Sequence, residues 1–406
     1  MRLAFLPGRV RRAAGRQLRR LRGVERRVVR LEPHGEPLGR IAFSYVVDPF
    51  LARSEGRIAY AHTQDWESWT MARTWRSLGF RVDVLHWTNA DWLPDGPLDV
   101  LVDARSNLER LAPHAGAGCL RIFHAETAHW RTNDEAQRRR LDELEARRGI
   151  RLTRTRLVGE NRAIETADCA TVLGGEWTLS SYRPFGKPLY RVPISNAFVY
   201  PSPEAKDFEA CRGRFLWFGG VGFVHKGLDR VLEAFAGVDG LALGVAAPLD
   251  REPDFAEAYR RELWRTPNVR ALGWLDVASA RFEAVAAQTL GMVFPSCSEG
   301  GGGSAITAMH VGLIPLLTHE TSVDLTPDQG VILADAGVET IRRTALALSA
   351  RPAEELRATA LAAWKRAQAE HTRQAFETNY RRTALEILER FRPELVKKLE
   401  ARGGAA

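Results

Sequence analysis

Several features are scarce or missing in this 406-residue sequence, and each absence excludes a class of protein. No apolar run approaches the roughly 20 residues that a membrane-spanning helix needs, and the basic start lacks the apolar core of a secretory signal. The four cysteines show no paired spacing, which argues against a disulfide framework or a zinc ribbon and for a reducing compartment; they are Cys119, Cys169, Cys211 and Cys297. We therefore expect a cytoplasmic protein, soluble or peripheral to a membrane.

Sequence patterns that carry well-known chemistry are also missing. No two aspartates are separated by a single residue, so a metal clamp of the Asp-any-Asp type is absent and no divalent metal or other cofactor is implied. The sequence has no nucleophile elbow, no His-Glu-any-any-His pattern and no Walker lysine. What remains is a site that stabilises charge with backbone amides and one lysine.

The formal net charge of +8 is concentrated at the start of the chain. Residues 1–30 contain eleven arginines against one acid, Glu25, so this stretch carries +10 and the rest of the chain −2. Apolar residues recur among the arginines at helical spacing, which predicts a basic amphipathic helix within an arm over residues 1–38. Such helices lie on anionic lipid surfaces. A disordered tail or a partner-binding helix is the alternative, whereas the lack of aromatics beyond Phe5 argues against nucleic acid.

A run of four glycines, Gly300 to Gly303, is the most informative stretch. It follows a predicted buried strand, Leu290 to Phe294, and precedes a short helical pattern and a second strand, Ile314 to Leu317. Each ordered glycine costs roughly 0.5–1 kcal/mol relative to alanine, so four together indicate close approach of a ligand to the backbone. Because amides at a helix start bind anions, the stretch predicts a phosphate cradle. A mobile loop is the alternative.

Glu299, the glycine loop, the helix and the segment Gly312 to Pro315 together resemble the signature of family-4 retaining glycosyltransferases of the GT-B fold. The resemblance implies a catalytic Glu299 that orients the donor sugar, and a nucleotide-sugar site formed by Gly300, Gly301, Gly302, Gly303, Ser304 and Thr307. The family has a second glutamate eight residues after the first, which holds the ribose. Thr307 stands there instead, so that carboxylate is absent, and Thr307 is either a ligand contact or an ordinary residue of the first helical turn.

A second glycine-rich stretch follows the predicted strand Phe215 to Phe218. Lys226 lies at the start of the next helix, where the dipole disfavours a cation by some tenths of a kcal/mol and a bound diphosphate would reverse that penalty. The segment resembles the family's Lys-Gly step, which implies donor contacts from Gly219, Gly220 and Lys226. The family's usual arginine is missing, its place taken by Gly220, so the phosphates would have one side-chain cation fewer. A solvated lysine is the alternative.

The remaining pattern alternates strands with helices, which predicts parallel sheets with helices on both faces. With the resemblance, this implies an α/β fold of GT-B architecture, in which two Rossmann-like doubly wound domains face each other across a cleft. We expect an N-terminal acceptor domain over 39–197, a C-terminal donor domain over 198–370, and a C-terminal helix with a frayed tail over 371–406. In the family, such a helix crosses back to the first domain.

Three further residues of the N-terminal half are site candidates. His124 directly follows the predicted strand Leu120 to Phe123, and by position it resembles a family histidine that faces the donor sugar, so it is the second catalytic candidate. His62 and Asp65 follow the first strand of the predicted sheet and are candidates for acceptor contact, or simply parts of a surface loop. The charged stretch 133–149 predicts a helix that is a solvated face or a lid.

These observations predict a retaining, metal-independent glycosyltransferase that moves a sugar from a nucleotide-sugar donor to a glycan or lipid-linked acceptor in polysaccharide or cell-envelope biosynthesis. The basic arm would contact the inner face of a membrane. Two alternatives stay open. One is a non-catalytic sugar-nucleotide-binding or scaffold protein, suggested by the two lost charged positions, and the other is a GT-B sugar-nucleotide epimerase, which needs no separate acceptor.

Overall fold

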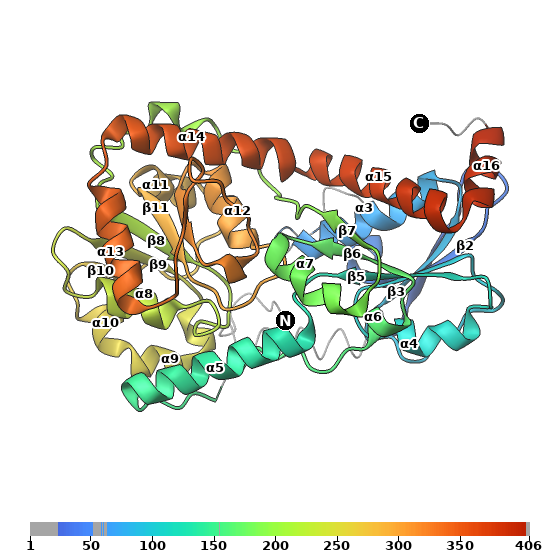
Figure 1. The fold of residues 1–406 in the computed structure, drawn as a ribbon, viewed down its shortest axis with the longest axis horizontal. Coiled ribbons are helices and arrows are strands. Elements are labelled where there is room, and N and C mark those ends of the chain that lie inside the picture. The colour runs from blue at the N-terminus through green and yellow to red at the C-terminus, as the bar shows by residue number, and fades with distance from the viewer. Residues whose placement is uncertain (1–22, 52–57, 59, 61–62, 154, 403–406) are drawn as a thin grey trace, which may run out of the picture.

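The computed structural model describes residues 23–51, 58, 60, 63–153 and 155–402, and it places two β-sheets side by side with helices packed around each (Figure 1). The predicted amphipathic helix of the arm lies mostly outside these residues. Within the described part of the chain, no helix is both long and apolar enough to cross a bilayer. The same residues contain no group of three or more His, Cys, Asp or Glu side chains arranged to hold a metal ion.

The first sheet has seven strands in the order β1-β3-β2-β4-β5-β6-β7. Neighbouring strands are parallel except at one edge, where β1 runs antiparallel to β3. The strands are β1 (Val28–Leu31), β2 (Arg40–Tyr45), β3 (Arg81–His86), β4 (Val100–Asp103), β5 (Leu120–Ala125), β6 (Cys169–Leu173) and β7 (Leu189–Val192). Helix α3 (Thr63–Ser77) covers one face, and the short helices α4 (Leu108–Leu111), α6 (Ala163–Thr166) and α7 (Glu176–Tyr182) lie on the other.

Strand β1 corrects the expected boundary of the basic arm. Residues 24–26 form a single 3-10 turn, and the following strand pairs with β3, so the folded domain begins before Gly39. The side chains explain this pairing. Val28 packs against the hydrophobic core on one face of the sheet, whereas Val29 packs on the other face. Arg30 donates to the buried Asp83 carboxylate at 2.6 Å.

The second sheet has six parallel strands in the order β10-β9-β8-β11-β12-β13. They are β8 (Arg214–Phe218), β9 (Ala242–Ala246), β10 (Val269–Ala271), β11 (Gly291–Phe294), β12 (Ile314–Leu317) and β13 (Val331–Ile332). The helices around this sheet are α8 (Leu228–Phe235), α9 (Pro253–Ala258), α10 (Arg260–Trp264), α11 (Ala280–Ala287), α12 (Gly303–His310), α13 (Val338–Ser349) and α14 (Ala353–Glu370). A buried core that includes Phe215, Trp217 and Phe235 fills the space between them.

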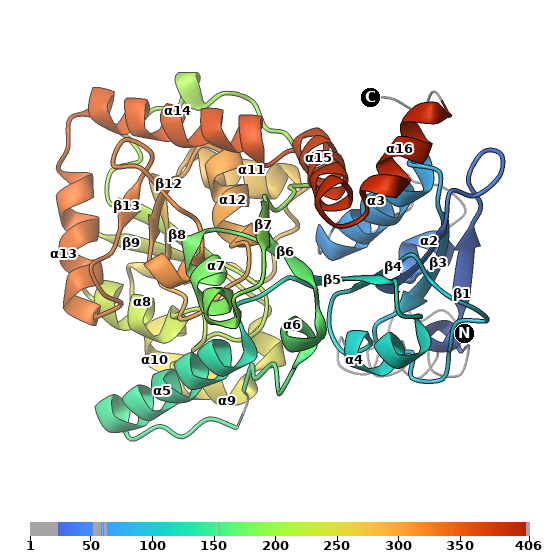
Figure 2. The same ribbon diagram turned by 45° about the vertical axis from the view of Figure 1, so that its right-hand side comes forward.

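Two long helices connect the domains (Figures 1 and 2). Helix α15 (Arg373–Phe391) continues from α14 and packs on α3 of the N-terminal domain, as the sequence predicted, and α16 (Pro393–Ala401) follows it. Helix α5 (Trp130–Arg148) leaves the N-terminal domain and lies along the C-terminal one. The prediction of a solvated helix or lid is wrong for α5, because its Leu144 is fully buried in the core of the C-terminal domain.

Candidate active site

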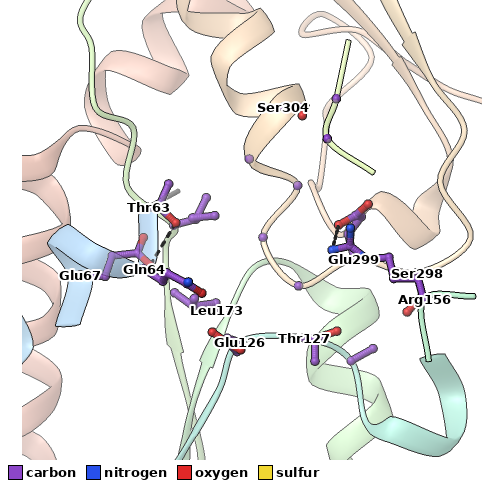
Figure 3. Close-up of a pocket in the computed structure, with 18 of the residues that line it drawn as sticks. Thr63, Gln64, Glu67, Glu126, Thr127, Arg156, Leu173, Ser298, Glu299 and Ser304 are labelled. Atoms are coloured by element: carbon purple, nitrogen blue, oxygen red, sulfur yellow. Dashed lines mark hydrogen bonds and ion pairs between the residues drawn. The ribbon is translucent and has the colours of Figure 1, made fainter. Parts of the chain in front are cut away.

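A cavity of about 860 Å³ lies between the two domains and receives side chains from both. Figure 3 shows Thr63, Gln64 and Glu67 of α3 on one side and Glu299 with Ser298 on the other. The carboxyl ends of β5 and β8 reach the cavity, as the rule for parallel sheets predicts. All residues predicted for the donor side line it: Gly219, Gly220, Lys226, Glu299, Gly300, Gly301, Gly302, Gly303, Ser304 and Thr307.

A buried ion pair between Lys226 and Glu299 is the centre of the C-terminal wall. The two residues are 73 positions apart in the sequence, and the structure places Lys226 Nζ 2.6 Å from Glu299 Oε1. Ser296 Oγ donates to the same oxygen at 3.0 Å. The ammonium group also lies 5.0 Å from the centre of the Phe294 ring. Gly227, which follows the lysine, has φ +73°, and a Cβ there would lie 2.5 Å from the Pro295 carbonyl oxygen, so this turn requires glycine.

The charges around Glu299 keep it ionised. Burial by itself raises the pKa of a carboxyl group, but the positive charges of Lys226 and Arg156 outweigh this and hold the pKa of Glu299 at about 2. Arg156 comes from the segment after α5, and its Nη2 lies 4.0 Å from Glu299 Oε2. Burial lowers the pKa of Lys226, and the ionised Glu299 beside it opposes this shift. The carboxylate thus lies between the amino group of Lys226 and the guanidinium group of Arg156.

The glycine loop lines the cavity, but close protein neighbours also explain its glycines, so the predicted close approach of a ligand is not needed to account for them. A Cβ on Gly300 would lie 1.9 Å from the carbonyl oxygen of Glu126. A Cβ on Gly301 would lie 2.8 Å from Cβ of Ile194, also in the N-terminal domain. Gly302 has φ +60°, and a Cβ there would lie 2.5 Å from Val323. A valine at position 302 would therefore strain the fold itself.

Two polar side chains near the glycine loop, Thr307 of α12 and Ser298, differ in their hydrogen-bond partners. Thr307 Oγ1 donates to Asn196 Oδ1 at 2.9 Å, so this hydroxyl contacts the segment that connects the two domains. Ser298 is 1% exposed and lines the cavity, yet its hydroxyl has no hydrogen-bond partner among the described residues. Because buried hydroxyls are normally satisfied, the Ser298 Oγ points to a ligand or an ordered water in this part of the cavity.

The predicted histidine contact is corrected by the structure. The strand extends two residues further than expected, so His124 lies within β5 and not in the loop after it. Its side chain is fully buried, does not line the cavity, and packs edge-on against Tyr45 at 5.6 Å between ring centres. Nδ1 lies 2.8 Å from Thr171 Oγ1, and burial lowers the pKa of His124 to about 3. The side chain therefore lies beneath the cavity wall and does not face the donor side, and its Nε2 has no hydrogen-bond partner among the described residues.

The predicted acceptor contacts are placed differently. His62 lies outside the described residues, and Asp65 does not line the cavity. Its neighbours Thr63, Gln64 and Glu67 do, because α3 begins at Thr63 and turns these side chains toward the cleft (Figure 3). The predicted segment reaches the cavity, and the phase of the first helical turn decides which of its side chains face it.

A further carboxylate on the N-terminal wall was not predicted as a ligand-binding group. Glu126 Oε2 accepts the Tyr45 hydroxyl at 2.8 Å, and Oε1 accepts Arg105 Nε at 2.5 Å. The Arg105 guanidinium lies 4.7 Å from the centre of the Trp87 ring. All four side chains line the cavity. Glu126 lies opposite the glycine loop, so this polar and aromatic wall faces the Lys226–Glu299 pair across the cleft.

Among known proteins, the similarity of this chain is one of fold. No family model matches the chain, and no curated protein matches it. Three solved structures are similar over most of their lengths. HepE from Anabaena, in complex with UDP-glucose, has a TM-score of 0.54 and 11% identity, covering 86% of this chain and 100% of that one. A glycosyltransferase from Rickettsia africae has a TM-score of 0.54 and 9% identity, covering 87% and 97%.

Sucrose-phosphate synthase from Thermosynechococcus elongatus has a TM-score of 0.53 and 16% identity, covering 86% of this chain and 99% of that one. The chain spans 59% of the larger S. aureus TarM structure, at a TM-score of 0.49. The likeness to HepE, to the Rickettsia protein and to sucrose-phosphate synthase, together with two largely parallel sheets beside a shared cavity, confirms the predicted GT-B fold.

Proposed function

We propose that this protein is a glycosyltransferase that transfers a sugar from a nucleotide-sugar donor to a glycan or lipid-linked acceptor, with retention and without a metal ion or other cofactor. The observation that carries the proposal is the buried Lys226–Glu299 pair, 2.6 Å apart, beside the glycine loop at the start of α12. A likeness of fold does not assign a function, so the argument rests on these groups.

The C-terminal wall offers what a sugar diphosphate requires. Lys226 supplies a positive charge, Ser298 supplies a hydroxyl without a protein partner, and the amides at the start of α12 lie at the positive end of the helix dipole. Trp274 and Leu275 lie further along the same wall and would pack on the base. HepE, solved in complex with UDP-glucose, has a similar fold, which supports a nucleotide-sugar donor.

In the proposed reaction the bond from the anomeric carbon to the diphosphate oxygen breaks, and a bond from that carbon to the acceptor hydroxyl oxygen forms on the same face. The hydroxyl proton passes to the leaving diphosphate. Lys226 and the loop amides stabilise the charge that develops on the diphosphate. Glu299, ionised at neutral pH, orients the donor sugar by accepting its hydroxyl hydrogens. The wall that carries Glu126 and Trp87 faces this centre and would receive the acceptor.

We place the reaction in the cytoplasm, in polysaccharide or cell-envelope synthesis, with the arginine-rich start of the chain on an anionic membrane surface. Because β1 belongs to the folded domain, the informative truncation removes residues 1–22 and no more. Loss of salt-sensitive binding to phosphatidylglycerol vesicles on this truncation would support the membrane contact, and unchanged binding would contradict it.

The main test separates binding of the diphosphate from turnover. In calorimetry with UDP, ADP and GDP, Lys226→Ala should weaken the best nucleoside diphosphate by roughly 1.5–3 kcal/mol, the range for a charge-assisted hydrogen bond. Glu299→Gln keeps the shape of the side chain, so we expect it to bind the nucleoside diphosphate nearly as well as the parent. Its turnover should fall by about 100-fold, or about 2.7 kcal/mol of transition-state stabilisation, once a donor and acceptor pair is known.

The matched control is Glu320→Gln, a nearby glutamate whose side chain does not line the cavity. Folding must be measured for each variant, since removing one partner of a buried ion pair destabilises a protein. Parent-like turnover of Glu299→Gln would remove the role given to this residue. Failure of the parent to bind any nucleoside diphosphate would contradict the proposed function.

A further inference from the structure

We propose that Arg156, on the segment that follows α5, supplies the second cation for the donor diphosphate, in place of the side-chain cation that Gly220 does not provide. This inference rests on the proposed function and deepens it. It implies that two distant parts of the chain hold the diphosphate, the loop with Lys226 and the segment that α5 lays against the C-terminal domain.

Arg156 lies close to Glu299, on the side opposite Lys226. Lys226 Nζ lies 2.6 Å from Oε1 of Glu299, and Arg156 Nη2 lies 4.0 Å from Oε2, so the two cations flank one carboxylate on its two oxygens. Together the three groups carry one net positive charge. The Arg156 side chain is 45% exposed and lines the cavity, whereas the Lys226 side chain is 8% exposed. The arginine is therefore the more accessible of the two cations.

The chain around Arg156 holds this side chain across the domain boundary. Arg156 Nη1 donates to the carbonyl oxygen of Val221 at 3.2 Å, and the Arg156 carbonyl accepts Asn133 Nδ2 at 3.2 Å. Gly222 has φ +92°, and a Cβ there would lie 3.0 Å from Cδ of Arg156. The loop after β8 thus leaves room for the arginine stem to pass over it. Val221 and Gly222 directly follow Gly220, so the guanidinium reaches the loop on which the cation is missing.

The hydrogen bonding favours a ligand over a purely structural role. Glu299 already accepts from Lys226 and Ser296, and 4.0 Å is too long for a hydrogen bond to Arg156. A guanidinium has five N–H donors, and among the described residues the acceptor that Arg156 uses is the Val221 carbonyl. The remaining donors can engage two phosphate oxygens side by side, the geometry for which arginine is suited.

The test compares affinities for UDP, ADP and GDP with affinities for the corresponding nucleosides, by calorimetry on the full chain. Arg156→Gln should weaken the best nucleoside diphosphate by about 10- to 100-fold and leave the nucleoside unchanged, because only the diphosphate meets the guanidinium. Arg156→Lys should recover part of the loss. The matched control is Arg151→Gln on the same segment, whose side chain is 81% exposed and pairs with Glu145. We expect it to bind like the parent.

A rescue variant tests the replacement directly. A Cβ at Gly220 meets no heavy atom within 4 Å, so a side chain can begin there without steric conflict at its first carbon. In the Arg156→Gln background, Gly220→Arg should restore at least half of the lost affinity on a logarithmic scale. No recovery in this double variant would overturn the proposed replacement.

The outcomes separate this inference from the proposed function. If Arg156→Gln binds nucleoside diphosphates like the parent while Lys226→Ala does not, the role of Arg156 is wrong and the proposed function stands. An equal loss of nucleoside and nucleoside diphosphate affinity would also overturn the role of Arg156, because it would indicate general damage to the site. If the parent binds no nucleoside diphosphate, the proposed function fails and the inference fails with it.

Discussion

Helices α5 and α15 both cross between the domains, but they attach by different means. Helix α15 packs on the N-terminal domain with an apolar face, in which Phe376 and Tyr380 stack and Trp75 Nε1 donates to the Tyr380 hydroxyl at 3.0 Å. Helix α5 buries Leu144 in the core of the C-terminal domain and adds several ion pairs to it. Arg147 contacts Asp229 and Glu233, each at 2.8 Å.

The difference shows how the two attachments respond to conditions. Burial of aromatic side chains is nearly independent of ionic strength, whereas partly exposed ion pairs weaken as salt screens them. Arg148 adds a further pair with Glu262 at 3.0 Å on the same side of α5. We therefore expect the attachment through α15 to be the permanent connection, and the ion-paired part of the α5 attachment to weaken as the salt concentration rises. Because Arg156 follows α5, the proposed donor site depends on the weaker attachment.

The largest expected effect is on the apolar attachment. Tyr380 is 1% exposed, so Tyr380→Ala should leave a cavity under α15 and lower the free energy of unfolding by about 3–5 kcal/mol. Tyr380→Phe is the matched variant, and it should cost about 1–3 kcal/mol because it leaves the buried indole N–H of Trp75 without its acceptor. Denaturant unfolding measures both. A loss below 1 kcal/mol for the alanine variant would show that α15 is not the permanent connection.

The next largest effect is a dependence of protein stability on pH, which arises from Glu67 beneath α15. Glu67 lies on α3, the helix under α15, and burial raises its pKa to about 7, even though the Ser195 amide and hydroxyl donate to it. A raised pKa means that the folded state binds the proton more tightly than the unfolded state does. The free energy of unfolding therefore falls as the pH rises from about 4.5 to about 7. Glu67→Gln should remove up to roughly 3 kcal/mol of this dependence. Stability measured at pH 5 and pH 8 tests it, and parallel pH profiles of variant and parent would contradict it.

The smallest expected effect is on the charged attachment. Arg147→Ala should lower stability by about 1–2 kcal/mol, more than an exposed pair and less than a fully buried one, because the arginine is 26% exposed and Asp229 is fully buried. Hydrogen exchange should accelerate in α5 and leave α15 unchanged, and 1 M salt should reproduce part of the effect in the parent. Arg138→Ala, on the exposed face of α5, is the control. Equal acceleration in both helices would contradict the comparison.

The sequence predicted much of the fold because parallel strands and apolar helix faces have regular patterns. The stripe that contains Phe376 and Tyr380 identified α15 in this way. Helix α5 was mistaken for a solvated face, because an ion-paired interface has the same composition as exposed surface. Only the tertiary structure shows that Arg147 is opposite Asp229.

The candidate site was predicted unevenly for similar reasons. Lys226 and Glu299 each follow a strand of one sheet, so their meeting could be expected from the strand order of the fold. The prediction for His124 depended on where β5 ends. The strand was expected to end two residues too early, so His124 was placed in the loop at the cleft, whereas it lies within β5 with its side chain buried. Arg156 lies in a segment without regular structure, and no local pattern connects it to a loop 65 residues away.

The contact between the glycine loop and the N-terminal domain also sets a mechanical limit. At Gly300 the nearest neighbour is the main-chain oxygen of Glu126, and at Gly174 it is the main-chain oxygen of Gly300, 1.7 Å from where a Cβ would stand. Main chain lies against main chain there, and no change of rotamer can make more room. The two domains therefore cannot approach each other further at this point. A motion that widens the cleft here would separate the glycines from the opposite domain.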